Sequence, residues 1–167
     1  MIEVNISASD KKKAAAIAKE IGPRKRSILN NKGAQAGYVG KIVVARLLGL
    51  DLCCGVDFDM VLGGVIKMAV KTKQTAGVPS PSFECSIEAG ATEQKCDWYV
   101  FVRVDKDTMS KAWILGYLPK VEYFEKATFL KKGDIVGDNK FEVKANCYNV
   151  PISALKPLPL PEKGGNA

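Results

Sequence analysis

Acidic and basic side chains come together in one segment of the chain, Gly55–Gln74, which reads GVDFDMVLGGVIKMAVKTKQ. Asp57 and Asp59 precede the apolar run MVL, and Lys71 and Lys73 end the apolar run that follows. The chain has no histidine, which excludes imidazole zinc ligands, histidine bases, and serine–histidine or cysteine–histidine nucleophile pairs. Chemistry in this protein therefore has to use carboxylates, lysines, cysteines or hydroxyls.

A glycine pair divides this segment into two strands. The apolar runs 56–62 and 65–73 are typical of short strands, and Gly63–Gly64 between them is typical of a turn that reverses the chain. Side chains alternate between the two faces of a strand, so Lys71 and Lys73 should share one face. We therefore expect the two lysines to project together beside the acidic end of the first strand.

The register of this hairpin decides whether the aspartates meet the lysines. A strict two-residue turn places Asp59 opposite Met68, on the wrong face for Lys71. A three-residue turn or a bulge places Asp59 opposite Ala69 instead, and it brings Asp57 opposite Lys71. We expect the shifted register, because an ionised aspartate beside Met68 in a core would cost on the order of several kcal/mol.

Helices and further strands must hold this hairpin in place. A basic, alanine-rich stretch at 11–21 predicts a first helix, and apolar residues at helical spacing over 35–50 predict the main core helix. Further strands are expected at 82–87, 98–104, 112–118 and 141–145, with a short helix or turn at 121–126. This order predicts an α/β or α+β sheet covered by helices. We divide the chain into a basic helix and linker (1–34), one domain (35–158) and a flexible tail (159–167).

The charge of the chain favours a polyanionic partner. Lysine and arginine total 25 against 18 aspartates and glutamates, which gives a net charge of +7. Such a surplus suits nucleic acid, because each lysine or arginine that meets a phosphate adds to a salt-dependent affinity. The cations of the first 34 residues could follow a phosphate backbone or simply form a solvated helix face. Those that we assign to nucleic-acid binding are Lys11, Lys12, Lys13, Arg24, Lys25 and Arg26.

Composition also indicates the compartment. A chain of 167 residues, 47% of them apolar, is long enough for one packed core. No apolar run is long enough to cross a membrane, and the chain does not start like a secretory leader, so we expect neither a membrane protein nor a secreted precursor. The five cysteines are odd in number and lack C-x-x-C spacing, which is typical of buried thiols in a reducing environment. The expected location is cytoplasmic.

The hairpin segment resembles the PD-(D/E)xK nuclease superfamily. In that family an aspartate precedes a short hydrophobic strand, and a hairpin then leads to a strand that carries D/E-x-K. Further segments resemble small phage and prokaryotic members of the family, and together they span roughly residues 32–158. These segments are GYVGKIVVARLLG before the hairpin, and CDWYVFVRV, ILGYLP and VPISALKPL after it.

The resemblance implies a restriction-endonuclease-like α/β fold, in which helices flank a central mixed β-sheet and one or two Mg²⁺ or Mn²⁺ ions lie over the scissile phosphate. It makes Asp59 the catalytic metal ligand, with Asp57 as the fallback, and the backbone carbonyl of Val70 a further ligand. Lys71 would hold or polarise the attacking water and neutralise charge on the phosphate. Lys73, Gln74 and Lys41 would contact the nucleic acid.

Two positions depart from the family pattern. Ala69 stands where D/E-x-K has its acidic residue, and Lys41 stands where the core helix often has a glutamate. Both changes remove negative charge from a site that a hard cation needs to be acidic. The chain could be a descendant that binds DNA without cutting it, an engineered variant with a disabled site, or a nuclease in which Glu84 or Glu88 replaces the missing carboxylate.

Two functions follow from these residues. The first is metal-dependent hydrolysis of nucleic-acid phosphodiester bonds, with DNA as the first expectation, unless Ala69 inactivates the site. The alternative is a non-catalytic module on the same fold that binds nucleic acid or protein. A homodimer is compatible with the first function, because two sites cut both strands of a duplex most simply. A purely structural interpretation also stands, in which the aspartates cap a hairpin and the lysines form a solvated edge.

Overall fold

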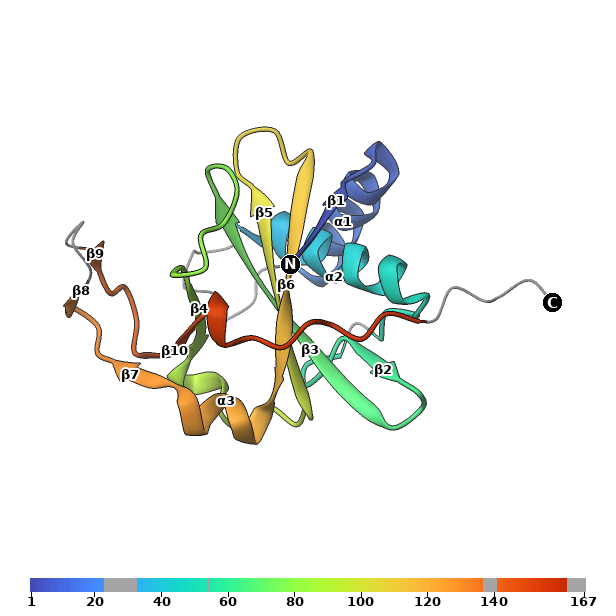
Figure 1. Cartoon of the computed structure of the whole chain (residues 1–167). Coiled ribbons are helices and arrows are strands. Elements are labelled where there is room, and N and C mark those ends of the chain that lie inside the picture. The colour runs from blue at the N-terminus through green and yellow to red at the C-terminus, as the bar shows by residue number, and fades with distance from the viewer. Residues whose placement is uncertain (23–32, 54, 137–140, 162–167) are drawn as a thin grey trace.

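The computed structural model describes residues 1–22, 33–53, 55–136 and 141–161, and the fold that they form is mixed α/β (Figure 1). These residues contain three α-helices, α1 (Ala8–Ile21), α2 (Ala34–Leu48) and α3 (Lys120–Lys126). The strands are β1 (Ile2–Asn5), β2 (Met60–Leu62), β3 (Ile66–Thr75), β4 (Glu84–Glu88), β5 (Trp98–Asp105), β6 (Lys111–Pro119), β7 (Thr128–Leu130), β8 (Ile135–Val136), β9 (Phe141–Glu142) and β10 (Cys147–Pro151). Two 3₁₀ turns cover Ala89–Ala91 and Ile152–Ala154.

The main sheet is a curled mixed sheet of five strands in the order β1-β6-β5-β3-β2. Its central pair, β3 and β5, is parallel, and the other pairs are antiparallel. The parallel register sets Lys71 beside Phe101 and Lys73 beside Arg103. β2 is short, so β3 is an edge strand beyond its first half. The part of β3 that carries the lysines therefore has a strand neighbour on one side alone.

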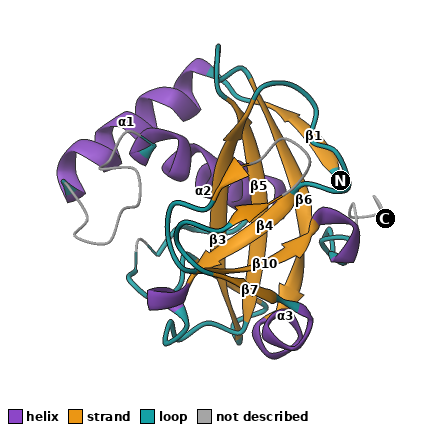
Figure 2. Cartoon of the chain, turned by 90° about the vertical axis from the view of Figure 1, so that its left-hand side faces the viewer, coloured by secondary structure: helices purple, strands orange, loops and turns teal. Residues whose placement is uncertain are grey.

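Each face of the main sheet has its own apolar core. α1 and α2 cover one face, on which Met68, Val70 and Val100 are buried. The small sheet β4-β10-β7 and α3 cover the other face, on which Ala69 and Tyr99 are buried (Figure 2). Because strand side chains alternate, even-numbered residues of β3 face the helices and odd-numbered residues face the small sheet. The main sheet thus separates two apolar cores, one toward the helices and one toward the small sheet.

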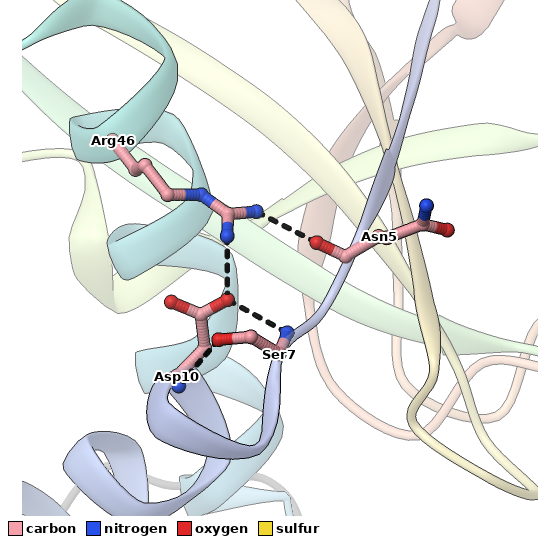
Figure 3. Close-up of polar contacts among 4 residues, drawn as sticks. All are labelled: Asn5, Ser7, Asp10 and Arg46. Carbon is pink, nitrogen blue, oxygen red and sulfur yellow. Dashed lines mark hydrogen bonds and ion pairs between the residues drawn. The ribbon is translucent and has the colours of Figure 1, made fainter.

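The N-terminal residues are part of the main sheet and of its helical layer. β1 pairs with β6, and Ser7 caps α1 in a capping box with Asp10. Asp10 also accepts a hydrogen bond from Arg46 of α2 at 2.9 Å, and the same guanidinium donates to the carbonyl of Asn5 at 2.7 Å (Figure 3). One arginine therefore ties β1, α1 and α2 together.

Most predicted elements exist, with changed bounds. The first helix begins at Ala8 rather than Lys11. α2 ends at Leu48 and is capped by Gly49, whose φ of 65° lies in the left-handed region that glycine favours. The strand expected at 56–62 is confined to Met60–Leu62, and the strand expected at 141–145 to Phe141–Glu142. The sequence patterns gave no signal for β1, β7 or β10. Each of these is short and pairs with a strand that is not next to it in chain order.

Two expectations about composition can be compared with the structure. Cys85 and Cys96 are buried, but the expectation of a buried thiol is wrong for Cys53, which is exposed because it lies in the loop between α2 and β2. In the part of the chain that the structure describes, no helix is both long and apolar enough to cross a membrane. Arg24, Lys25 and Arg26 lie outside the described residues, as do residues 162–167 of the tail.

Candidate site at the edge of the β2–β3 hairpin

The hairpin has the shifted register that the sequence predicts. Leu62 pairs with Ile66 and Met60 with Met68, so three residues, not two, form the connection. Gly63 and Gly64 adopt φ angles of 59° and 75°, a region that glycine enters without strain. The shifted register is therefore confirmed for Met60–Leu62, whereas Asp59 itself lies beyond the last ladder pair.

Asp59 lies just before β2 and bonds to β3 through both its backbone and its side chain. Its backbone N–H donates to the carbonyl of Met68 at 2.8 Å, and its Oδ2 accepts from the N–H of Val70, also at 2.8 Å. The carboxylate thus occupies the place that a longer β2 would fill along the edge of β3. Asp59 is only 4% exposed, so this carboxylate is withdrawn from water and depends on its protein donors.

Lys41 supplies the counter-charge from α2. Its Nζ lies 2.7 Å from Oδ1 of Asp59, and its side chain is largely buried. The same ammonium lies 5.0 Å from the centroid of the Tyr38 ring, one turn earlier on the helix. Both oxygens of Asp59 therefore have donors, a backbone amide on one and an ammonium on the other. Lys41, which the sequence assigned to nucleic-acid contact, is instead the direct partner of the aspartate.

Lys71 lies on the face of the main sheet that is turned toward the small sheet. It is an odd-numbered residue of β3, and its Nζ donates to Oε1 of Gln94 at 2.7 Å and lies 5.3 Å from the centroid of the Tyr99 ring. Burial lowers the pKa of Lys71, an effect that the negative charge of nearby Asp59 partly opposes. The structure therefore brings Asp59, Val70 and Lys41 into contact, while the amine of Lys71 is held by Gln94.

Asp57 forms no salt bridge with Lys71 either. Its Oδ1 accepts a hydrogen bond from the backbone N–H of Lys95 at 3.2 Å, which ties the loop before β2 to the loop before β5. The pairing of β2 with β3 ends at Met60, so the expected position of Asp57 opposite Lys71 is not a ladder pair. Asp57 and Asp59 thus bind different parts of the chain.

The donors around Asp59 do not fit a hard divalent cation as they stand. Mg²⁺ and Mn²⁺ prefer several carboxylate and water oxygens, whereas this carboxylate already carries an ammonium at 2.7 Å and Ala69 offers no oxygen in its side chain. Val70 presents its carbonyl to the same strand edge as its N–H, which gives one neutral donor. Among the described residues, no three His, Cys, Asp or Glu side chains form a group that could hold a metal ion.

The carboxylates considered as replacements lie on β4. Burial raises the pKa of Glu84, and the nearby charge of Lys73 opposes this shift. The charge of Glu88 is felt by Lys71. Glu84 and Glu88 are therefore close to the lysines of β3, and neither belongs to a group with Asp59 of the kind that binds a metal.

The remaining residues assigned to nucleic-acid binding lie on α1 and β3. Lys12 and Lys13 are exposed on α1, whereas Lys11 donates to the carbonyl of Thr108 at 3.0 Å. Lys73 and Gln74 are exposed near the end of β3. The structure adds one cation that the sequence analysis missed, Arg103, which the β3–β5 register places beside Lys73. An arginine inside the apolar strand WYVFVRV was the available signal, but its partner strand could not be read from the sequence.

No protein-family model and no curated protein sequence matches this chain.

Proposed function

We propose that this protein binds nucleic acid through a restriction-endonuclease-like scaffold whose metal centre has been replaced by an ion pair. The observation that carries the proposal is the 2.7 Å contact between Nζ of Lys41 and Oδ1 of Asp59. Asp59 is a position at which the sequence matches the nuclease pattern, and Lys41 is a position at which it departs from that pattern. Their contact sets a fixed positive charge beside the carboxylate that would otherwise hold a metal.

The order of elements supports the nuclease-like scaffold. A buried helix, α2, precedes the β2–β3 hairpin, and the aspartate before β2 meets the edge of β3 beside Val70. β5, the aromatic strand of the resemblance, then pairs parallel to β3. These features agree with the order of helix, hairpin and strand on which the resemblance was based.

The chemistry of the ion pair supports binding without cleavage. A metal ion in a nuclease lowers the pKa of a bound water and carries two positive charges that stabilise the transition state. An ammonium carries one charge, and here Asp59 already neutralises it. The site therefore lacks a means of generating hydroxide, while the surplus of lysine and arginine remains available for phosphates, with DNA as the expected partner.

The competing candidate is an active nuclease that uses Mg²⁺ or Mn²⁺. One observation favours it: the carboxylate of Asp59 and the backbone of Val70 already lie together at the strand edge, so a cation that displaced Lys41 would find both. The two candidates differ in whether Lys41 blocks metal binding, and this can be measured directly.

Substituting Lys41 tests the proposal. Lys41→Glu should create a site with two carboxylates and bind Mn²⁺ roughly tenfold or more tightly than the unmodified protein, as measured by isothermal titration calorimetry. Lys41→Gln is the matched control, because it removes the ammonium without adding a carboxylate, and it should gain little. If the unmodified protein binds Mn²⁺ as tightly as Lys41→Glu does, the ion pair is no substitute for a metal and the proposal is wrong.

A further inference from the structure

A second group of cations lies on the face of the main sheet that is opposite to α2. Lys73 of β3 and Arg103 of β5 are direct neighbours in the parallel register, and both are odd-numbered residues of their strands. Nζ of Lys73 donates to Oγ of Ser86 at 2.5 Å, and Nη2 of Arg103 donates to the backbone carbonyl of Glu84 at 2.9 Å. Both cations therefore reach across from the main sheet to β4.

Neither of these cations has a carboxylate as an ion-pair partner among the described residues. The salt bridges of the described chain involve other lysines and Arg46, and the partners of Lys73 and Arg103 are a hydroxyl and a carbonyl. Ser86 in turn donates to Oδ1 of Asn149, so the hydroxyl is fixed by a second neutral group. The two positive charges thus lie side by side with neutral hydrogen-bond partners, and the carboxylate of Glu84 acts on Lys73 without forming a salt bridge to it.

Their surroundings disfavour these charges in the free protein. Protein atoms crowd the ammonium of Lys73 although the residue reaches the surface, and this desolvation lowers its pKa, with the charge of Arg103 as the next cause. Desolvation also lowers the pKa of Arg103. Two like charges that have lost part of their hydration are stabilised most effectively by an anion between them.

An exposed aromatic ring borders the pair. Phe83, just before β4, is 41% exposed, and Cζ of Arg103 lies 5.4 Å from the centroid of its ring. The contact holds the guanidinium in place and leaves part of the ring open to solvent. A cation pair beside an exposed aromatic face is the combination with which proteins bind single strands, because the cations take the phosphate and the ring stacks on a base.

We propose that Lys73 and Arg103 bind one backbone phosphate of a single-stranded nucleic acid and that Phe83 stacks on an adjacent base. This inference deepens the proposed function and depends on it for the identity of the ligand. It differs from the Asp59–Lys41 site in position and in residues, since the two lie on opposite faces of the main sheet.

Salt dependence tests the phosphate contact. The affinity for a fluorescent 12-nucleotide single strand is measured by anisotropy over a series of KCl concentrations, for the unmodified protein and for the Lys73→Gln/Arg103→Gln double variant. Loss of one phosphate contact should lower the slope of log affinity against log salt by about 0.7. The matched control is Lys131→Gln, which removes an exposed cation of the β7–β8 turn and should leave the slope unchanged. An unchanged slope in the double variant overturns the site and leaves the proposed function intact.

Two matched variants test whether Phe83 stacks on a base. Phe83→Ala should weaken binding of the same oligonucleotide about tenfold. Phe129→Ala removes a ring of nearly equal exposure, 42%, that packs on Tyr148, and it should have no effect on binding. Equal affinities of the two variants would contradict the assignment of Phe83.

Inorganic phosphate separates a failure of the site from a failure of the proposed function. In a phosphate titration followed by ¹H–¹⁵N NMR, the side-chain signal of Arg103 and the amide of Ser86 should shift in the unmodified protein. In the double variant, which lacks the Arg103 side chain, the amide of Ser86 should stay fixed. If phosphate shifts these signals but the oligonucleotide does not bind, the cation pair is an anion site and the nucleic-acid function is wrong. If neither ligand has an effect, both proposals are overturned.

Discussion

Lys41 and Asp59 form an ion pair that is almost closed to solvent, with side chains 13% and 6% exposed. Such a pair gains little over an apolar pair of the same shape, because both charges lose their hydration. The additional hydrogen bond from Val70 offsets part of that loss for the carboxylate. Removing either charge alone would leave the other buried without compensation, so the pair is maintained as a unit even if it adds little net stability.

The thiol of Cys85 predicts how stability depends on pH. Burial raises the pKa of Cys85 from 9.0 to about 12. Between these values the unfolded thiol loses its proton while the folded one keeps it, so stability is complete below pH 9 and falls as the pH rises. At pH 10 this one group should lower the free energy of unfolding by about 1.4 kcal/mol.

Urea unfolding at pH 7.5 and pH 10 measures this effect. Cys85→Val keeps an apolar side chain in the core but removes the thiol, so the variant should lose about 1.4 kcal/mol less than the unmodified protein between the two pH values. Cys53→Ala, at an exposed thiol, should retain the full loss. Identical losses for all three proteins would contradict the assignment to Cys85.

α2 and β3 pack so closely that one glycine controls their distance. A Cβ atom at Gly40 would lie 2.9 Å from Cγ2 of Thr72 and closer still to its Oγ1. Thr72 is β-branched and cannot swing all of these atoms away. The hydroxyl is buried and has no hydrogen-bond partner among the described atoms, which agrees with its tight enclosure. This contact sets the depth at which α2 lies and hence the reach of Lys41.

Gly40→Ala should therefore destabilise the protein by about 1–3 kcal/mol through overpacking, measured by urea unfolding. Gly37→Ala is a matched control on the same helix, because a Cβ there meets nothing within 4 Å. It should be neutral or stabilise the protein by up to about 1 kcal/mol, since alanine favours helix. Adding Thr72→Ala to Gly40→Ala should restore part of the loss. A stable Gly40→Ala variant would show that the helix can shift without cost.

The hairpin and α2 could be predicted because their signals are local. The charge of Asp59 and the apolar side chain of Met68 select one register of the β2–β3 hairpin, and Gly49 marks the end of α2. The partners of β1 and of Arg103 could not be predicted, because β1 pairs with a strand about 110 residues away and β5 joins β3 across an intervening strand. Which basic residues meet therefore depends on pairings that no single segment encodes.

The contacts of the candidate site likewise could be predicted only in part from the sequence. The sequence identified Asp59 and Lys41 as the informative positions, but it grouped Asp59 with Lys71 in one catalytic site. Whether an amine at the edge of β3 turns toward α2 or toward β4 depends on which layer covers each face. Gln94, which accepts a hydrogen bond from Lys71, lies in the loop before β5, and Tyr99 lies on β5 with its ring buried on the face toward the small sheet.

The two faces of the main sheet give the molecule two separate sets of cations. The helical face buries Lys41 against Asp59, whereas the face toward β4 presents Lys73 and Arg103 beside an exposed ring. Since the chain carries a net charge of +7, its general attraction to a polyanion is a property of the whole surface. Specific contact is expected where cations lack salt-bridge partners, and among the described residues Lys73 and Arg103, on the face toward β4, have none.

Binding of a labelled oligonucleotide in EDTA and in Mn²⁺, at matched ionic strength and followed by a denaturing gel, tests most directly whether an ammonium has taken over the place of a metal. We expect the same dissociation constant in both buffers, within about twofold, and full-length oligonucleotide at every time point. The opposite result is cleavage that appears in Mn²⁺, disappears in EDTA and is abolished by Asp59→Ala, and it would identify the protein as an active nuclease.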